Sequence, residues 1–377
     1  MDESPRLASL DALRGFAIAS MMLVNNPGDW KHLHAPLAHA PWNGWTFTDL
    51  VFPFFLFASG VAMRLSIDRR AGEGASRPRL LASAARRALV IFLVGVALNF
   101  VPSFDPATVR IPGVLQRIAL CAFIAAPLLI WGGWRSTLAA IAALFALYAI
   151  PMQLVPVLGD DGVVAAGRLE PGRDFGAWLD RLVFGNHLWS QSRTWDPEGL
   201  LSTLPAVASL LFGALAGAYL SRRDDRRRAP AMALAGAAFL AAGLAMDALW
   251  MPINKNLWTP SYAVFMTGWS LVAMALFQAL LDESPPKVRE GARKALLPLA
   301  IFGMNALFLF ALSGLVARIL GAIRVREATT LKAWLYEPIR SLPIAPENAS
   351  LVFAALFATA MFAVAWLMWK KRWIVKA

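Results

Sequence analysis

The strongest constraint on the fold is a series of apolar runs, each about twenty residues long, that recurs along the whole chain. A run of this length spans the hydrocarbon core of a bilayer as a helix. The 377 residues are 58% hydrophobic and only 16% charged, whereas soluble domains average about 25% charged. We therefore predict an all-α integral membrane protein, a polytopic bundle of about ten transmembrane helices that forms a single domain over residues 1–377. The predicted spans are 8–25, 47–67, 83–101, 113–131, 135–156, 200–221, 229–251, 260–281, 297–319 and 349–369.

Basic residues cluster in the short loops at one end of the predicted spans. By the positive-inside rule these loops are cytoplasmic, and about ten spans then place both termini in the cytoplasm. The same pattern explains the net charge of +12 without nucleic acid as a partner. The predicted outward loops are 25–46, 102–112, 157–199, 252–259 and 320–348. The basic clusters are Arg69, Arg70, Arg77 and Arg79; Arg222, Arg223, Arg226, Arg227 and Arg228; Lys287, Arg289, Arg293 and Lys294; and Lys370, Lys371, Arg372 and Lys376.

Several kinds of site are not supported by the sequence. The single cysteine, Cys121, excludes an intrachain disulfide and a cysteine-cluster metal site. No GxxxxGK[ST], HExxH or GxSxG pattern occurs, so we expect neither a P-loop ATPase nor a zinc site, and no metal. Arg14 interrupts the first apolar run, which we expect to be a membrane span and not a removed signal peptide.

The stretch 39–53 combines polar, aromatic and apolar residues where a span begins. Thr46 and Asp49 before an apolar run form a capping-box pattern, which predicts a helix start. Pro53 cannot donate a hydrogen bond to the carbonyl of Asp49, and so leaves that carbonyl free. His39 lies close by in the sequence, and imidazole is the usual general base near neutral pH. All four histidines fall in predicted outward loops, so chemistry with a histidine base is expected at the outer face.

The first predicted span carries charged and amide groups. Asp11 and Arg14 lie three residues apart and can pair on one helix face, either as a functional pair or as a pair that fixes the helix at the cytoplasmic rim. The helix from residue 9 to residue 24 covers only about 24 Å, less than the hydrocarbon core of about 30 Å. We therefore expect an outward cavity lined by Asn25 and His39.

Other polar residues interrupt later spans. Gln116 and Arg117 lie in the outer half of the fourth span, where an arginine either meets an anion or extends to the interface. Asn305 is a single amide in an apolar run, a pattern typical of interhelical hydrogen bonding as well as of ligand contact.

Tryptophans and polar turn residues gather in the outward loops. An interfacial aromatic belt explains most of the tryptophans. Trp42 and Trp45 follow shortly after His39, and there they could stack on a sugar ring. The turns near 196–199 and 252–258 are explained by turn chemistry alone, or form a sugar-binding rim. The candidate acceptor-binding residues are Trp42, Trp45, Asp196, Glu198, Asn254, Lys255, Asn256 and Trp258.

Seven segments together resemble the bacterial relatives of heparan-α-glucosaminide N-acetyltransferase, in the wider transmembrane acyltransferase group. The resemblance implies that acetyl-CoA enters from the cytoplasm and that its acetyl group passes to an amino sugar on the far side. It further implies that His39 matches the catalytic histidine, that Asn25 and Asp49 share its site, and that the chain forms a homodimer. We expect no counterpart of the N-terminal luminal domain and extra first span of the lysosomal members. The segments are Ser9–Gly15, Leu23–Gly28, His39–Phe57, Arg110–Arg117, Asp196–Pro205, Pro252–Trp258 and Gly303–Phe308.

Roles follow for the candidate catalytic residues. We hypothesise that His39 is a general base toward the acceptor, that Asp49 orients it, and that Asn25 donates to the oxyanion. His39 could instead carry the acetyl group itself, and the His39–Asp49 pair could simply anchor a loop. The candidate contacts for acetyl-CoA are Arg14, Gln116, Arg117 and Asn305.

Two further functions remain open. One is an O-acyltransferase that modifies an envelope glycan or an exported metabolite at the same site. The other is a solute transporter whose path is lined by Asp11, Arg14, Asn25 and Arg117. In each case we expect a multi-pass protein in contact with the lipid of the bacterial inner membrane, with its site open to the periplasmic face.

Overall fold

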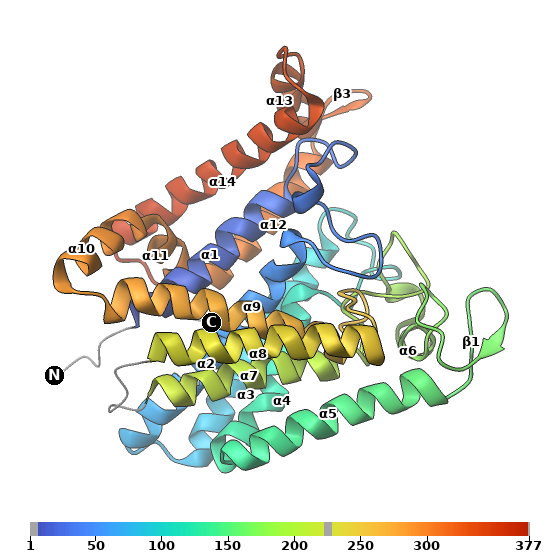
Figure 1. The fold of residues 1–377 in the computed structure, drawn as a ribbon. Coiled ribbons are helices and arrows are strands. Elements are labelled where there is room, and N and C mark those ends of the chain that lie inside the picture. The colour runs from blue at the N-terminus through green and yellow to red at the C-terminus, as the bar shows by residue number, and fades with distance from the viewer. Residues whose placement is uncertain (1–6, 222–227, 376–377) are drawn as a thin grey trace.

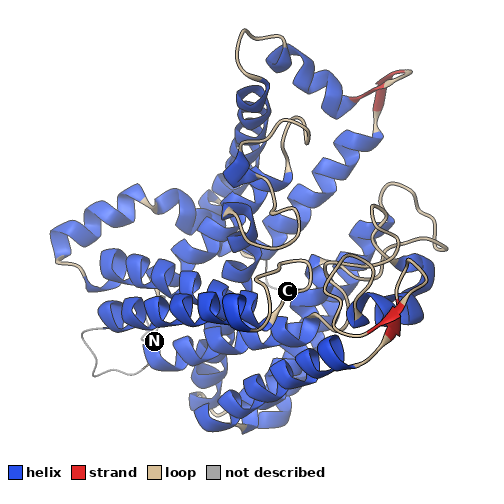
Figure 2. Ribbon diagram, turned by 45° about the vertical axis from the view of Figure 1, so that its right-hand side comes forward, coloured by secondary structure: helices blue, strands red, loops and turns tan. Residues whose placement is uncertain are grey.

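The computed structural model describes residues 7–221 and 228–375, and these are almost entirely helical (Figures 1 and 2). Loops and two short hairpins gather at one end of the bundle. We call it the His39 end, because it includes the segment between residues 25 and 47 in which His39 lies. The helices are α1 (Ala8–Asn25), α2 (Phe47–Gly72), α3 (Arg77–Phe100), α4 (Val114–Trp131), α5 (Trp134–Leu154), α6 (Phe175–Phe184), α7 (Thr203–Leu220), α8 (Arg228–Leu249), α9 (Pro260–Gln278), α10 (Pro286–Ala295), α11 (Leu297–Met304), α12 (Ala306–Ala322), α13 (Leu331–Arg340) and α14 (Pro346–Lys370).

The predicted all-α membrane fold is confirmed. Eight helices among the described residues are long and apolar enough to cross a membrane, or nine if the bent pair α11–α12 is one span. The sequence predicted about ten. The remaining predicted span, 8–25, is the 18-residue helix α1, which is less apolar because it carries Asp11, Arg14 and Asn25.

Helices α2, α7 and α9 form the centre of the bundle, and α3 and α8 lie at its periphery. In the apolar 18-residue stretch of α7, 72% is buried by the rest of the protein, whereas in that of α8 only 17% is buried. Glycines allow α2 and α7 to approach closely: a Cβ on Gly60 would lie 1.9 Å from the Leu210 carbonyl oxygen, and one on Gly213 would lie 2.1 Å from that of Phe57. Small residues at such crossings are typical of membrane helix packing.

The ninth predicted span is not one straight helix. It is broken into α11 and α12, which meet at 82°, and Asn305 lies at the break. The Asn305 side chain donates to the Trp373 carbonyl at 2.9 Å and accepts from the Val375 N–H at 2.9 Å. Asn305 therefore holds the segment after α14, and the expectation of an amide within a continuous helix is wrong.

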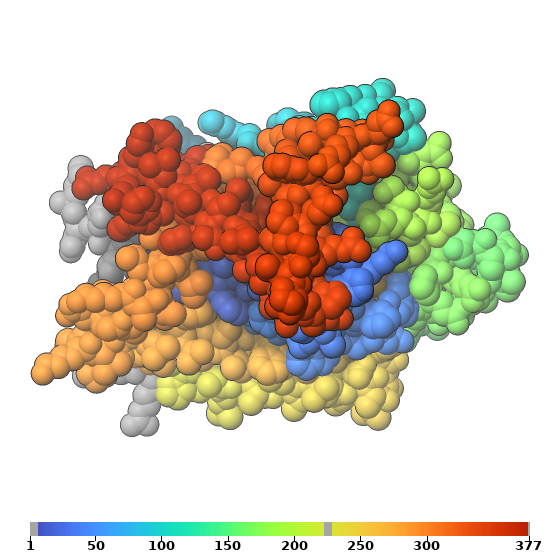
Figure 3. Space-filling model, turned by 90° about the horizontal axis from the view of Figure 1, so that it is seen from above, coloured from blue at the N-terminus to red at the C-terminus, as the bar shows by residue number. Residues whose placement is uncertain are grey.

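Two of the predicted loops contain regular structure. Loop 157–199 holds the hairpin β1–β2 (Val157–Leu158 and Val164–Ala165) and helix α6, and loop 320–348 holds the hairpin β3–β4 (Arg324–Arg326 and Thr329–Thr330) and helix α13. Figure 3 shows the α13 region lying over the segment after α1. There the Gly28 N–H donates to the Ser350 carbonyl at 3.2 Å, and a Cβ on Gly28 would clash with the Tyr336 ring.

The basic segment between α2 and α3 and helix α10 lie at the left-hand end of the bundle in Figure 1, away from the His39 end. This placement agrees with the predicted charge asymmetry. The predicted cluster residues Arg222, Arg223, Arg226, Arg227 and Lys376 lie outside the described residues.

Candidate active site

The centre of the site is the pair His39 and Asp49. The His39 Nδ1 lies 2.7 Å from Asp49 Oδ1, and the other carboxylate oxygen accepts from the Ala40 N–H at 3.1 Å and from the Thr46 N–H at 3.0 Å. Helix α2 begins at Phe47, as the capping pattern predicted. The Asp49 side chain is 1% exposed and that of His39 is 42% exposed. A fixed buried carboxylate thus orients the imidazole through Nδ1, and the exposed part of the ring is open to a ligand.

The carbonyl that Pro53 frees is used within the protein. The hydroxyl of Tyr262, in α9, donates to the Asp49 carbonyl oxygen at 2.6 Å. Tyr262 is fully buried, and a buried carbonyl without a partner would be costly. The central helix α9 therefore fixes the start of α2, and with it Asp49. The sequence predicted the free acceptor but not its donor.

Lys255 brings a cation to the imidazole. Its Nζ lies 3.4 Å from His39 Nε2 and 3.5 Å from Nδ1, so it stands beside the ring and is not aligned with one nitrogen. Burial lowers the pKa of Lys255, although the charges of Glu198 and Asp49 oppose this shift. An ammonium held here can donate to negative charge that develops next to His39.

The loop that presents Lys255 is fixed by its neighbour Asn254. The Asn254 side chain accepts from the Leu257 N–H at 2.9 Å and donates to Asn43 Oδ1 at 3.0 Å. Asn254 is fully buried, so its amide is committed to the protein. The side chain closes the loop from within, and its contact with the acceptor stays a prediction.

Arg110, Asp196 and Glu198 form an ion cluster near this loop. Arg110 donates through Nε to Asp196 at 2.8 Å, and through Nη2 to Asp196 and to Glu198, each at 2.5 Å. Burial alone would lower the pKa of Arg110, but Glu198 and Asp196 outweigh it and raise that pKa. Burial likewise acts against ionisation of Glu198, yet Arg110 and other nearby cations lower the Glu198 pKa. Burial and the neighbouring Glu198 raise the pKa of Asp196, against the effect of Arg110. The ion pairs of Arg110 with Asp196 and Glu198 hold the 196–199 turn.

Arg117 lies inside the bundle. It is 1% exposed, so the alternative that it extends to the interface is excluded. Its Nη2 donates to the Gly199 carbonyl at 3.1 Å and to the Ser202 hydroxyl. Its guanidinium carbon lies 5.2 Å from the ring centre of Trp258. Among the described residues, Arg117 Nε and Nη1 and Gln116 Nε2 are buried without a hydrogen-bond partner, which leaves donors for a ligand.

The tryptophans of the predicted rim have different surroundings. Trp258 is 1% exposed and packs on Phe52 with ring centres 5.1 Å apart. Its indole lies under Arg117, and its contact with the acceptor stays a prediction. Trp42 donates through Nε1 to the Leu169 carbonyl at 2.7 Å. Trp45 packs on Phe265 of α9, with ring centres 5.1 Å apart.

Three predicted site residues lie apart from the pair. Asn25 is exposed at the end of α1, and among the described residues no hydrogen bond joins it to His39 or Asp49. Arg14 pairs with Asp11 at 3.8 Å in the first half of α1, which confirms the predicted pairing. Asn305 is hydrogen-bonded to the segment after α14.

Several groups close to the site have no distinguishing pattern in the sequence. Arg110 is the first residue of a motif, and Tyr262 is one residue of an apolar run. Asp174 and Asp180 lie in a long predicted loop, where acidic residues are ordinary. The structure buries both carboxyls beside Asp196. Only their burial, which the sequence does not reveal, distinguishes them.

Comparison with known proteins gives one consistent result. The family described as "Heparan-alpha-glucosaminide N-acetyltransferase, catalytic" matches residues 6–176. The human protein named heparan-alpha-glucosaminide N-acetyltransferase is 29% identical over 329 residues, which cover 74% of this chain and 49% of the human protein. The mouse protein of that name is 28% identical over 328 residues, with the same two shares. The chain thus spans about half the length of the curated relatives it matches.

Proposed function

From its distant relationship to heparan-α-glucosaminide N-acetyltransferase, we propose that this chain is a transmembrane acetyltransferase. The donor is acetyl-CoA, approaching from the cytoplasmic side, and the acceptor is an amino sugar at the outer face. The observation that carries the proposal is the buried Asp49 carboxylate bonded to a half-exposed His39 with Lys255 beside it. This combination of base, orienting group and cation suits acyl transfer.

In the proposed reaction His39 acts as the base. With Nδ1–H donating to Asp49, the imidazole presents the lone pair of Nε2 to the acceptor amine. His39 accepts a proton from the amine as the nitrogen forms a bond to the acetyl carbonyl carbon. Asp49 stabilises the imidazolium, and the proton is then available to the departing thiolate. A histidine that first carries the acetyl group is the alternative, and ping-pong kinetics would identify it.

Lys255 and Arg117 supply positive charge in this proposal. The Lys255 ammonium lies 3.4 Å from His39 Nε2, where it can donate to the carbonyl oxygen as that oxygen becomes an oxyanion. Arg117 Nε and Nη1 and Gln116 Nε2 are buried donors without a partner among the described residues, and they fit the polar groups of a donor that reaches the site through the bundle. The donor supplies the activated acetyl group. Asn25 stays a prediction as an oxyanion donor.

The test is acetyl transfer by purified protein with labelled acetyl-CoA and a panel of amino sugars, with products identified by mass spectrometry. The variant H39A should lose at least about a hundredfold in rate. The matched control is H32A, because His32 Nδ1 also lies 2.7 Å from a carboxylate, that of Asp29. Full transfer by H39A would exclude His39 as base or acyl carrier.

A further inference from the structure

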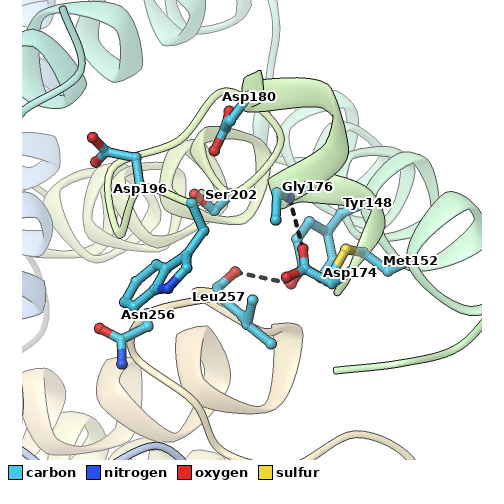
Figure 4. Close-up of a pocket in the computed structure, with 11 residues that line it drawn as sticks. Tyr148, Met152, Asp174, Gly176, Asp180, Asp196, Ser202, Asn256 and Leu257 are labelled. Carbon is cyan, nitrogen blue, oxygen red and sulfur yellow. Dashed lines mark hydrogen bonds between the residues drawn. The ribbon is translucent and has the colours of Figure 1, made fainter. Parts of the chain in front are cut away.

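A small pocket lies beside the candidate active site, where the end of α5, the start of α6, the 196–202 turn and the loop at 256–257 meet (Figure 4). Its volume is about 20 Å³, which is room for about one water-sized group. Asn256 connects it in the chain to Lys255, and Asp196 connects it to the Arg110 cluster. Its lining includes Tyr148, Asp174, Asp180, Trp195, Asp196 and Asn256.

Two carboxylates of this pocket are almost completely buried. Asp174 is 2% exposed and Asp180 is 3% exposed. Asp174 Oδ1 accepts from the Ala177 N–H at 2.9 Å, and Asp180 Oδ1 accepts from the Leu200 N–H at 2.8 Å. Asp174 Oδ2 is buried and has no hydrogen-bond partner in the part of the chain that the structure describes. A buried acceptor of this kind is costly unless a ligand or water completes it.

In the described part of the chain, the hydrogen bonds and ion pairs of the nearby cations go to groups other than Asp174 and Asp180. Arg110 pairs with Asp196 and Glu198, and Arg117 donates to a carbonyl and a hydroxyl. Arg181 donates to the carbonyl oxygens of residues 158, 172 and 194. Within residues 7–221 and 228–375, neither Asp174 nor Asp180 has a salt-bridge partner. The pocket therefore holds more acidic groups than the cations around it neutralise.

We propose that this pocket binds the primary ammonium group of a small ligand, with Asp174 and Asp180 as its carboxylate partners. An ammonium has three N–H donors and is close to water in size. Asp174 Oδ2 offers it the open acceptor, and the Trp195 ring on the pocket wall offers a surface that favours cations. The ligand is a small amine separate from the acceptor, because under the proposed function the acceptor nitrogen must lie unprotonated beside His39 to attack the acetyl group.

Proton binding by the two carboxyls makes this site sensitive to pH. Burial raises the pKa of Asp174 to about 6 and that of Asp180 to about 7. Both carboxyls are therefore protonated at pH 5 and largely ionised at pH 8. Affinity for a permanent cation should rise about tenfold or more over this range, since binding favours the ionised forms. The charged and titratable groups that face them are Arg181 and Tyr148 for Asp174, and Asp196, Asp174 and Arg117 for Asp180.

The binding test uses the purified full chain in detergent and titration calorimetry with methylammonium, which like lysine stays protonated below about pH 10. Potassium ion is the matched probe, because it has the same charge and about the size of an ammonium group but no N–H donor. We expect methylammonium to bind at pH 8, about tenfold more weakly at pH 5, and about tenfold more tightly than potassium ion. The variants D174N and D180N should each lose about tenfold in affinity.

D161N is the control variant, because Asp161 lies in the exposed β1–β2 hairpin. Absence of methylammonium binding at pH 8, or equal binding by wild type, D174N and D180N, would overturn the proposal. The transfer assay separates this site from the acceptor site. The KM for glucosamine should be unchanged in D174N while methylammonium binding is lost. A glucosamine KM that rises in D174N with kcat retained would place the pocket in the acceptor site and overturn its assignment to a separate amine. Both outcomes are independent of whether H39A abolishes transfer.

Discussion

At the scale of single residues, the site depends on charged groups whose partners come from distant parts of the chain. Asp49 receives hydrogen bonds from its own helix start and loop, while its carbonyl is fixed by Tyr262. Lys255 reaches His39 from a loop more than two hundred residues later in the chain. The chemistry of the pair is thus set by local sequence, and its electrostatic surroundings by the fold.

Replacement of Lys255 tests its role beside the imidazole. K255M should lower kcat by about a hundredfold, as loss of one oxyanion donor does, and K255R should retain part of the rate. Burial lowers the Lys255 pKa. Wild-type activity should therefore fall at a lower pH than the loss of a proton from a solvent-exposed lysine would produce. In K255R this fall should move to higher pH. The matched control is K31M, which removes an exposed lysine, and a normal rate in K255M would contradict the assignment.

Asp180 gives a stability prediction with a defined sign. Its pKa is raised to about 7, chiefly by burial, so the folded protein holds this proton more tightly than the unfolded chain. That contribution to stability is complete below about pH 4 and is lost as pH rises through about 7. D180N should therefore be more stable than wild type at pH 8 by about 1–2 kcal/mol, and similar to it at pH 5.

Thermal unfolding in detergent at both pH values measures this difference. D161N should instead be less stable than wild type by a similar amount at pH 5 and at pH 8, because hydrogen bonding from the Val163 N–H and the neighbouring arginines lower the pKa of Asp161, and the stability from a lowered pKa is lost only below about pH 4. If D180N is less stable than wild type at pH 8, the prediction is wrong, and nearby groups stabilise the ionised Asp180 carboxylate.

At the scale of elements, close helix crossings determine where the site residues are held. Helices α2 and α7 meet through Gly60 and Gly213, and α1 and α11 meet through Gly15 and Gly303. A Cβ on Gly15 would lie 1.7 Å from the Leu299 carbonyl oxygen. Helix α2 carries Asp49, and α7 follows the 196–202 turn. The α2–α7 crossing therefore also sets the distance between the His39–Asp49 pair and the 196–202 turn.

A larger side chain at this crossing should separate the helices. G60V should reduce the stability of the purified protein by about 2–4 kcal/mol, because the methyl groups meet backbone and cannot be accommodated by side-chain movement. G291A is the control, since a Cβ there meets nothing within 4 Å and alanine favours the α10 helix. Equal melting temperatures for G60V and wild type would show that α2 and α7 are less tightly joined.

At the scale of the whole molecule, charge and hairpins are distributed unequally between the two ends. The His39 end carries β1–β2, α6 and α13, and the opposite end carries α10 and the basic segment between α2 and α3. We infer from the positive-inside rule that the His39 end faces outward and that the opposite end is cytoplasmic. A site that joins a cytoplasmic donor to an outer acceptor requires this orientation.

Cysteine labelling tests the orientation. Cys121 is fully buried, so the wild-type chain should resist a membrane-impermeant maleimide. Ser103, after α3, and Ser76, before α3, are both exposed and form a matched pair. S103C should be labelled in intact spheroplasts, and S76C only after the membrane is permeabilised. The reverse pattern would invert the topology and place His39 in the cytoplasm.

Local sequence patterns were sufficient for the elements and for one part of the site. Helix periodicity and apolar composition predicted the helical segments, and Thr46, Asp49 and Pro53 predicted where α2 begins and which carbonyl it leaves free. The spacing of His39 and Asp49 was short enough for their pairing to be proposed from the chain alone. These features depend on neighbours within about ten residues, which the sequence displays directly.

Tertiary structure alone decided which distant groups meet and which polar residues stay accessible. Asn254 and Trp258 looked like rim residues but are buried, Asn305 breaks a helix to hold the tail, and Asp174 and Asp180 become a carboxylate pocket. The sequence could not show these outcomes because burial and long-range pairing depend on how helices pack. That packing is fixed by glycine contacts and by the total of many small interactions, none of which is visible in one segment.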